Sequence, residues 1–250
     1  MLDDMSDENS TSPGDKQAPL SSRLEALWQR AAVAGELLPG EPALAEELTA
    51  SRPALREALV RLEERGYITR RQGADTAINR ALLDIPARLD EKVENGRLIT
   101  AMGKEAKVDL LELRWTTATS KEVAEYGLVE GQEVLRTKKV WLADEVPVIL
   151  ANDAIPLRAK NLSKSDVDAR LSVFELCELL GNPAANWETV WLGARVLGED
   201  AGVMRGEPGD PVLSLDVTGI TKSGSVGYWA AERHRSEAFR YAMIRSMARR

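Results

Sequence analysis

The stretch from Leu38 to Asn79 constrains the fold of this 250-residue chain more than any other. Its first part predicts a short helix that runs through Leu44 to Leu48, followed by a turn over residues 49–51. A second helix is expected next, because apolar residues recur at the i, i+3, i+4, i+7 spacing of one helical stripe: Leu55, Ala58, Leu59 and Leu62. Ser51 is the expected N-cap, and Pro53 falls in the first turn, where a missing N–H costs nothing.

The residues after this second helix predict a β-hairpin. Past Gly66, residues 67–71 form the first expected strand, residues 72–75 the turn and residues 76–78 the return strand. Two helices joined by a tight turn and followed by a hairpin define a winged helix-turn-helix. In that fold the second helix enters a DNA major groove, and the hairpin touches the backbone or the minor groove.

The same stretch resembles the DNA-binding domain of GntR-family bacterial repressors. The match is long and without gaps, and it is carried by Leu38-Pro39, Glu41, Leu44 to Leu48, Ser51-Arg52, Arg56, Ala58-Leu59, Arg61-Leu62-Glu63 and Arg70 to Gly73. The chain departs from the family pattern at Pro42, at Pro53-Ala54 and at Ala74-Asp75, where the family has arginine, two threonines and Arg-Gly. The resemblance implies DNA contacts from the second helix and the wing, through Ser51, Arg52, Pro53, Ala54, Arg56, Arg70, Arg71, Gln72 and Gly73.

The flanking sequence sets the expected domain boundaries. Residues 1–18 are rich in small polar and acidic residues and predict a disordered tail. An apolar stripe over residues 20–34 predicts the first helix of the winged domain, ending at Gly35. The winged domain is thus expected over residues 19–80, a linker over 81–94, and a second domain over 95–250.

The second domain is expected to be α+β. Strands are predicted over residues 108–117, 134–142, 148–155, 187–196 and 212–221, and residues 226–232 lead into a last strand over about 234–244. Short helices are predicted over residues 120–126, 171–180 and 200–204. Consecutive strands joined by short turns favour an antiparallel sheet with helices on one side.

This half resembles the UTRA effector-binding domain of the HutC branch of GntR repressors. The matching residues are Gly131 to Leu135, Leu142-Ala143-Asp144, Pro147, Ile155-Pro156, Val173 to Leu176, Gly209 to Leu213 and Arg235 to Phe239. The resemblance implies a fold like that of chorismate lyase, with a small molecule bound in a cleft beside the sheet.

The UTRA resemblance also suggests effector-binding residues. The family grips anionic effectors with an Arg-x-Arg pair, which here aligns with Lys139 and Trp141; a frequent family glutamate falls on Ala151. Glu232 and His234 occupy last-strand positions that often contact ligand. Core packing for Trp141 and a core-edge position for His234 are the alternative interpretations.

Composition narrows the function classes. With one histidine, one cysteine and no glycine-rich phosphate loop, the chain has no convincing catalytic group, metal site or cofactor site. The net charge is −7, yet the arginines of residues 20–80 concentrate in the second half of that range. One cysteine, no apparent signal peptide and no long apolar run predict a cytoplasmic protein that does not span a membrane.

These observations predict a DNA-binding transcription regulator, and specifically a repressor whose affinity for DNA depends on a small-molecule effector. It is expected to act as a homodimer on a palindromic operator, since two-fold protein symmetry requires two-fold DNA symmetry. Two alternatives stay open. One is a constitutive DNA-binding protein whose C-terminal domain only dimerises, and the other is an enzyme that uses the lyase-like domain.

Overall fold

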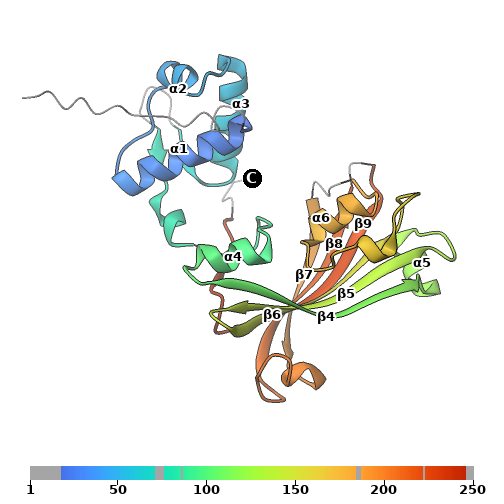
Figure 1. Ribbon diagram of the computed structural model, residues 1–250. Coiled ribbons are helices and arrows are strands. Elements are labelled where there is room, and N and C mark those ends of the chain that lie inside the picture. Colours follow the sequence, from blue (N-terminus) through green and yellow to red (C-terminus); the bar gives the residue numbers. More distant parts are fainter. Residues whose placement is uncertain (1–17, 71–75, 86, 184–186, 222, 246–250) are drawn as a thin grey trace, which may run out of the picture. The chain divides into compact units, whose positions relative to one another are not determined.

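The computed structural model describes all residues except 1–17, 71–75, 86, 184–186, 222 and 246–250 (Figure 1). The predicted tail therefore lies outside the described residues, apart from Ala18. The chain divides into two compact units. The first contains the residues up to Asp90 together with the C-terminal segment from Ala242, and the second runs from Glu91 to Tyr241.

Three helices build the first unit: α1 (Leu20–Ala34), α2 (Glu41–Glu47) and α3 (Arg52–Glu64). The helix expected over residues 20–34 is confirmed, and Gly35 ends it in the left-handed conformation, at φ +79°. The apolar stripes meet in one core, where Leu24, Leu44, Leu55 and Leu59 are fully buried. The helix-turn-helix therefore rests on apolar burial, as its sequence pattern predicts.

The described part of the wing follows α3. Strand β1 (Ile68–Thr69) pairs with β2 (Ala77–Ile78), and a 3-10 helix, η2 (Arg80–Asp84), comes next. The indole of Trp28 donates a hydrogen bond to the Tyr67 carbonyl over 2.9 Å, which ties the hairpin to α1. The expected turn over residues 72–75 lies outside the described residues.

The C-terminal segment returns to the first unit. Strand β10 (Tyr241–Ala242) pairs with β3 (Ala87–Arg88), and the Leu89 amide donates to the Ala242 carbonyl over 2.8 Å. Ile244 packs against the helical core. The boundary of 95–250 expected from the sequence thus differs from the structural one, because the last described residues, 242–245, join the DNA-binding unit.

A six-stranded antiparallel sheet forms the second unit, in the order β4-β5-β6-β9-β8-β7 (Figure 1). The strands are β4 (Ala106–Thr117), β5 (Glu133–Ala143), β6 (Val146–Pro156), β7 (Trp187–Val196), β8 (Pro211–Ile220) and β9 (Val226–Arg235). The predicted bounds of β7 are confirmed. The last strand was expected over about 234–244, but β9 runs unbroken through Glu232 to Arg235 and ends before β10.

Helices α4 (Asn95–Ala101), α5 (Ser120–Tyr126) and α6 (Val173–Leu179) accompany this sheet, with short 3-10 turns η3 (Lys164–Asp166) and η4 (Glu199–Ala201). Phe174 of α6 meets Tyr228 edge-on, whereas Tyr126 of α5 stacks on Trp229 at 4.5 Å. Neighbouring residues of a strand point to opposite faces. The prediction of helices on one side is therefore wrong for α5, which lies on the other face.

Local signals set several boundaries in this unit. Thr119 caps α5 and forms a capping box with Glu122. The turn between β5 and β6 consists of two residues, Asp144 and Glu145, both at positive φ, which suits a tight hairpin. Cys177 is buried, and burial raises the pKa of its thiol to about 12.

Candidate DNA-binding surface and effector site

The first turn of α3 is the exposed part of the helix-turn-helix. Ser51 caps the helix as predicted, accepting a hydrogen bond from the Ala54 amide over 3.4 Å. Arg52, Pro53 and Ala54 are all exposed, because the apolar stripe of α3 turns toward the core. Among the described residues, no hydrogen bond or ion pair holds the Arg52 guanidinium. It is therefore available to a phosphate or a base edge.

Carboxylates of the chain already partner the next arginines. Arg56 Nε lies 2.8 Å from Glu41 Oε2, and this pairing raises the pKa of Arg56. Arg61 pairs with Glu57 one turn away, over 2.6 Å. Both pairs are well exposed, so water and salt screen them and each contributes little to stability. DNA phosphates can compete for such arginines.

Arg70, at the start of the wing, is held more firmly. Its guanidinium contacts the Glu63 carboxylate at 2.9 Å and 3.0 Å, and its backbone amide donates to the same carboxylate over 2.8 Å. The backbone hydrogen bond, with the arginine charge, lowers the pKa of Glu63. Arg70 thus ties the wing to α3. The other predicted wing contacts, Arg71, Gln72 and Gly73, lie outside the described residues.

In the second unit, three of the four predicted effector residues surround one small inner pocket. Lys139, Trp141 and Glu232 line it, together with Lys92 and Asp153. Its volume of about 20 Å³ is enough for a single water molecule. The predicted residues are brought together, but the space between them is already filled by side chains of the chain itself.

The positive charge of Lys139 is balanced by a buried carboxylate. The ammonium lies 3.0 Å from Asp153 Oδ2 and donates to the Leu171 carbonyl, also over 3.0 Å. The Thr137 hydroxyl donates to the same Asp153 oxygen over 3.0 Å. The side chains of Lys139 and Asp153 are only 2% and 6% exposed. Asp153 therefore stands where an anionic ligand would meet this cation.

A second buried network is centred on Glu232. Its carboxylate lies 3.4 Å from Lys92 Nζ and 2.8 Å from His234 Nε2, and the Tyr241 hydroxyl bonds His234 Nδ1 over 2.6 Å. Burial acts to raise the pKa of Glu232, but the Lys92 charge and the His234 hydrogen bond outweigh it and lower that pKa. Burial also raises the pKa of Tyr241, so this hydroxyl stays protonated.

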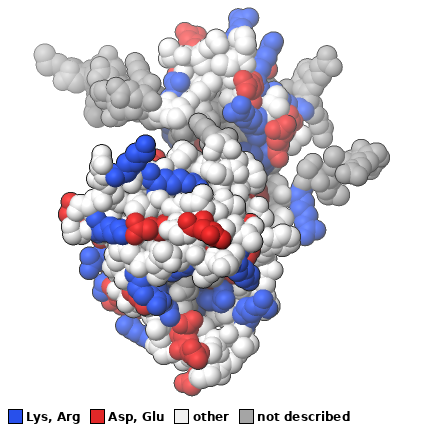
Figure 2. Space-filling model, turned by 90° about the vertical axis from the view of Figure 1, so that its right-hand side faces the viewer, with Lys and Arg blue, Asp and Glu red and all other residues white. Residues whose placement is uncertain are grey.

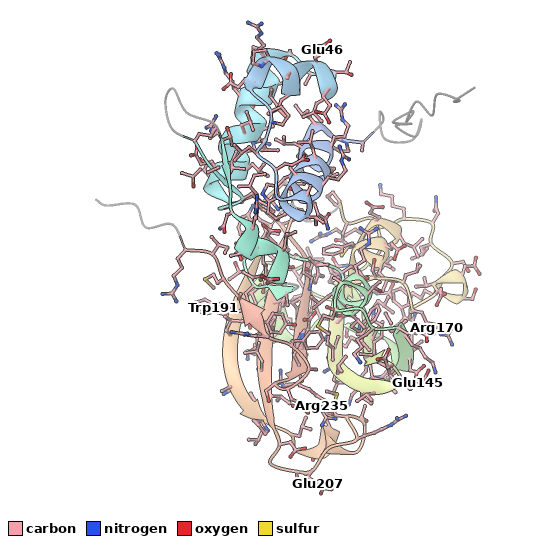
Figure 3. All side chains as sticks on the ribbon, turned by 90° about the vertical axis from the view of Figure 1, so that its left-hand side faces the viewer. Glu46, Glu145, Arg170, Trp191, Glu207 and Arg235 are labelled. Atoms are coloured by element: carbon pink, nitrogen blue, oxygen red, sulfur yellow. The ribbon has the colours of Figure 1, made fainter. Side chains whose placement is uncertain are left out.

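A larger hollow opens outside the inner pocket. It has a volume of about 790 Å³ and lies between the start of α4 and the segment before α6. Trp141 forms part of its wall, with Phe174 and Leu171 as further apolar surface and Arg97 and Arg170 as cations. Figure 3 labels Arg170 at the surface of this unit. Trp141 is thus the predicted residue that a ligand of ordinary size can reach.

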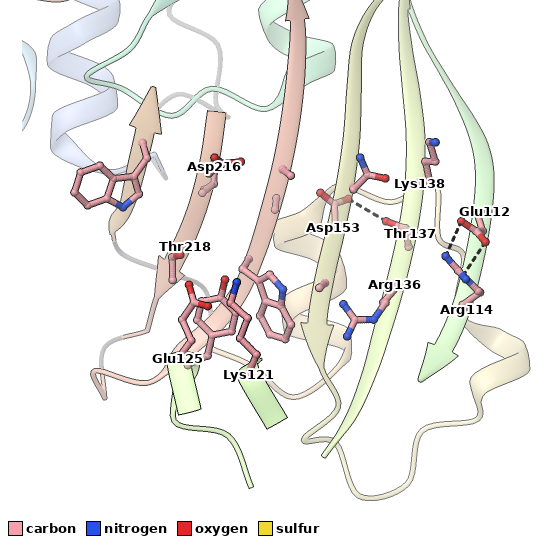
Figure 4. A pocket seen from close by; sticks show the side chains of 18 residues that line it. Glu112, Arg114, Lys121, Glu125, Arg136, Thr137, Lys138, Asp153, Asp216 and Thr218 are labelled. Carbon is pink, nitrogen blue, oxygen red and sulfur yellow. Dashed lines mark hydrogen bonds and ion pairs between the residues drawn. The ribbon is translucent and has the colours of Figure 1, made fainter. Parts of the chain in front are cut away.

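The opposite face of the sheet carries a third hollow, of about 580 Å³ (Figure 4). Charged residues of both signs line it, among them Arg136, Lys138, Glu125 and Asp216. Arg136 pairs with Glu122 over 2.8 Å and, despite partial burial of the carboxylate, lowers the pKa of Glu122 to about 2. Figure 2 shows the same mixture of positive and negative side chains over the visible face of the molecule.

Comparison with known proteins agrees with this geometry. Residues 101–240 match the model of the UTRA domain, and residues 24–78 match that of "Bacterial regulatory proteins, gntR family". The chain belongs to the GntR family of regulators and carries a C-terminal UTRA domain. It is a transcription regulator with an effector-binding domain, as the resemblance implies, and the UTRA domain agrees with the HutC branch.

Solved structures show the same fold. The chain is similar to PhnF from Mycobacterium smegmatis, with a TM-score of 0.59 and 18% identity over 92% of this chain and 100% of that one. It is also similar to the possible transcriptional regulator YydK from Bacillus subtilis, with a TM-score of 0.69 and 14% identity over 93% and 99%. No curated protein matches the chain by sequence.

No helix among the described residues is both long enough and apolar enough to cross a membrane. Within the same residues, histidine, cysteine and carboxylate side chains form no cluster that would hold a metal ion. The family and its structural neighbours are regulators rather than enzymes.

Sequence reasoning missed three members of the UTRA site. Lys92 falls in the stretch assigned to the linker, Asp153 in an apolar strand, and Tyr241 in a strand expected to run on to residue 244. A charged residue within an otherwise buried strand is the one signal that could have indicated Asp153, since such a charge needs a partner. Lys92 and Tyr241 carry no such local signal.

Proposed function

We propose that this GntR regulator is a homodimeric repressor that binds a palindromic operator and responds to a small molecule in its UTRA domain. The observation that carries the proposal is the exposed first turn of α3, where Arg52 has no partner among the described residues while the opposite helix face is buried. Two copies of α3 would occupy successive major grooves, which sets a half-site spacing of about one helical turn of DNA.

The DNA contacts follow from these positions. Arg52 would read a base edge or bind phosphate first, because it is free to move. Arg56 would join it by exchanging Glu41 for a phosphate, at little cost for an exposed pair. Arg71, Gln72 and Gly73 would supply the wing contact, with Arg70 fixing the wing to α3.

The effector class follows from the buried carboxylates. An anion would have to compete with Asp153 for Lys139, and removing a partner from a buried charge costs several kcal/mol. We therefore propose a neutral or singly charged effector with an apolar or aromatic part, seated in the outer hollow against Trp141 and Phe174. A doubly charged sugar phosphate fits the inner pocket poorly, because Asp153 and Glu232 already partner the lysines that line it.

The Glu232 network offers a route from effector to DNA. The chain leaves the DNA-binding unit after Asp90 and returns to it at Ala242. Lys92 and Tyr241, close to these two crossings, are both tied to Glu232, directly or through His234. Lys92 also lines the outer hollow. A ligand that shifts Lys92 would change the restraint on both connections, and coupling of this kind is typically worth about 1–3 kcal/mol.

Operator selection followed by titration tests this function. The full chain is used to select sequences from random DNA, and the enriched site is titrated with the native protein and with the Arg52→Ala variant. We expect a palindrome and a clear loss of affinity in the variant. Failure of the native chain to prefer any sequence over random DNA at low salt would refute the proposal.

A second candidate is a constitutive repressor whose UTRA domain only dimerises. The inner pocket favours this candidate, because Lys139, Glu232 and His234 already have partners within the chain. A thermal-shift screen separates the two candidates, with aromatic acids and amphiphiles in one panel and sugar phosphates in another. A compound that raises the melting temperature of the native chain but not that of the Trp141→Ala variant supports effector binding in the outer hollow. If no compound of either panel raises the melting temperature, the constitutive repressor is favoured.

A further inference from the structure

The two edge strands of the UTRA sheet differ in their protection against strand addition. Strand β4 carries four charged residues and an irregularity in its pairing between Leu110 and Glu112. Bulges and charges of this kind keep an edge from pairing with another chain. Strand β7 pairs with β8 in continuous register from Trp187 to Val196, and its sequence has neither proline nor lysine. It is the unprotected edge.

Strand β7 also exposes unusually large apolar side chains. Trp187 is 61% exposed and Trp191 72% exposed, and Leu192 and Val196 are exposed on the same strand. Figure 3 shows Trp191 at the margin of its unit. Long, apolar edge strands with unpaired N–H and carbonyl groups are templates for another strand. We propose that β7 pairs with β7 of a second copy of this chain, so that the two UTRA sheets join into one.

The order of residues along β7 fits such self-pairing. Trp187, Trp191 and Arg195 lie four residues apart, so all three point to one face. Antiparallel pairing about a two-fold axis at Trp191 places Trp191 beside its own counterpart and each Trp187 opposite Arg195 of the second copy. An arginine over an indole is a favourable cation–π pair. On the other face, Val190 then meets Leu192.

Gly193 fits the same register. A Cβ added there would meet only the Ser214 side chain, at 3.7 Å, so packing within this chain does not require a glycine. Glycine inside a strand often marks the close approach of another backbone or group. In the register centred on Trp191, Gly193 lies diagonally beside Trp191 of the second copy and leaves room for its indole.

The two exposed tryptophans supply a substantial share of the area that a stable contact buries. If a fully exposed tryptophan offers about 250 Å², Trp187 and Trp191 would together bury roughly 330 Å² per copy. A standard interface buries about 800 Å² per partner, and Leu192, Val196 and the backbone of the ten-residue strand contribute toward the rest. This inference rests on the proposed homodimer and names the surface that would form it.

Charge pairing at position 191 tests both the surface and the register. Trp191→Lys and Trp191→Glu variants of the full chain are examined by sedimentation, each alone and then mixed, without DNA. Like charges directly opposite each other across the two-fold axis oppose pairing, so each variant alone should dimerise about tenfold more weakly or worse. The mixture should recover a heterodimer, because lysine then faces glutamate. Leu111→Lys, on the β4 edge, is the matched control and should dimerise like the native chain.

The outcomes separate the surface from the function. A native chain that stays monomeric over the whole dilution series would refute both the β7–β7 pairing and the homodimer. Lone variants that dimerise as tightly as the native chain would refute the β7–β7 pairing and leave the homodimer intact. Weak lone variants without recovery in the mixture would refute the register centred on Trp191. Operator binding by the native chain, measured separately, addresses the regulatory function in each case.

Discussion

Both units of this GntR regulator hold cations next to carboxylates, but at very different depths. In the DNA-binding unit, Arg56 and Glu41 have side chains that are 66% and 38% exposed. In the UTRA unit, Lys139 and Asp153 are 2% and 6% exposed. An exposed pair contributes about 0–1 kcal/mol, whereas breaking a buried pair costs about 3–5 kcal/mol.

This difference decides which cations can bind an incoming anion. Water and salt weaken the Arg56–Glu41 attraction, so a DNA phosphate can replace Glu41 at low cost. Lys139 cannot exchange Asp153 in the same way, because Asp153 would remain buried and unpaired. The exposed pair can therefore exchange its carboxylate for another anion, whereas the buried pair closes the inner pocket to anions.

The strongest test of the contrast is the Asp153→Asn variant. The amide keeps the shape of the side chain and leaves the Lys139 charge buried without its counterion. We expect the UTRA unit to lose about 3–5 kcal/mol of unfolding free energy, measured by urea titration. A control replaces both partners, Lys139→Met with Asp153→Leu, and should recover most of the loss. A loss below about 1 kcal/mol in the single variant would show that water reaches this pair.

The second test compares how strongly acid lowers the stability of the two units. The pKa of Glu232 is lowered in the folded state, so its contribution to stability is present above its unfolded pKa of about 4.3 and is lost as the pH falls through the folded pKa. Lys92 and His234 face this carboxylate. In the DNA-binding unit the pKa of Glu63 is also lowered, so its contribution to stability has the same dependence on pH, but its side chain is more exposed.

We therefore expect stability to fall more steeply for the UTRA unit than for the DNA-binding unit between about pH 5 and pH 3. Urea titrations across this range measure the two transitions. The Glu232→Gln variant should flatten the acid dependence of the UTRA unit alone. Equal slopes for the two units in the native chain would contradict the contrast.

On DNA, the free arginine should outweigh the paired ones. Arg52→Ala is expected to weaken operator binding by about 1–3 kcal/mol if Arg52 contacts a base edge, and to relax specificity at that base. Arg61→Ala is the matched control, since Arg61 lies further along α3 and pairs with Glu57. Fluorescence anisotropy on operator variants measures both. Equal losses in the two variants would indicate phosphate contacts without base reading.

The smallest expected effect is a gain in affinity for DNA. Glu41→Gln releases Arg56 and removes a negative charge beside the DNA, so binding should tighten by no more than about 1 kcal/mol, most visibly at low salt. Glu57→Gln releases Arg61 and serves as the comparison. Weaker DNA binding by Glu41→Gln would mean that Glu41 positions Arg56 for recognition rather than competing with DNA.

Sequence alone determined the elements whose signals are local. The i, i+3, i+4, i+7 stripes, with Gly35 and Ser51 at their ends, predicted α1 and α3, and the strand predicted over residues 187–196 is β7. The signals of these elements lie within a few residues of the element itself. The family resemblance supplied the candidate effector residues, and the fold brings three of these four predicted residues to one pocket.

Only the tertiary structure decided the state of that pocket and the course of the chain end. Lys139 meets Asp153 through the β5–β6 pairing, Lys92 meets Glu232 across 140 residues, and Ile244 returns to the core of the DNA-binding unit. Such contacts join residues of different elements, so no pattern within one element predicts them. The sequence predicted which residues carry charge, and the fold determined which of those charges still have room for a ligand.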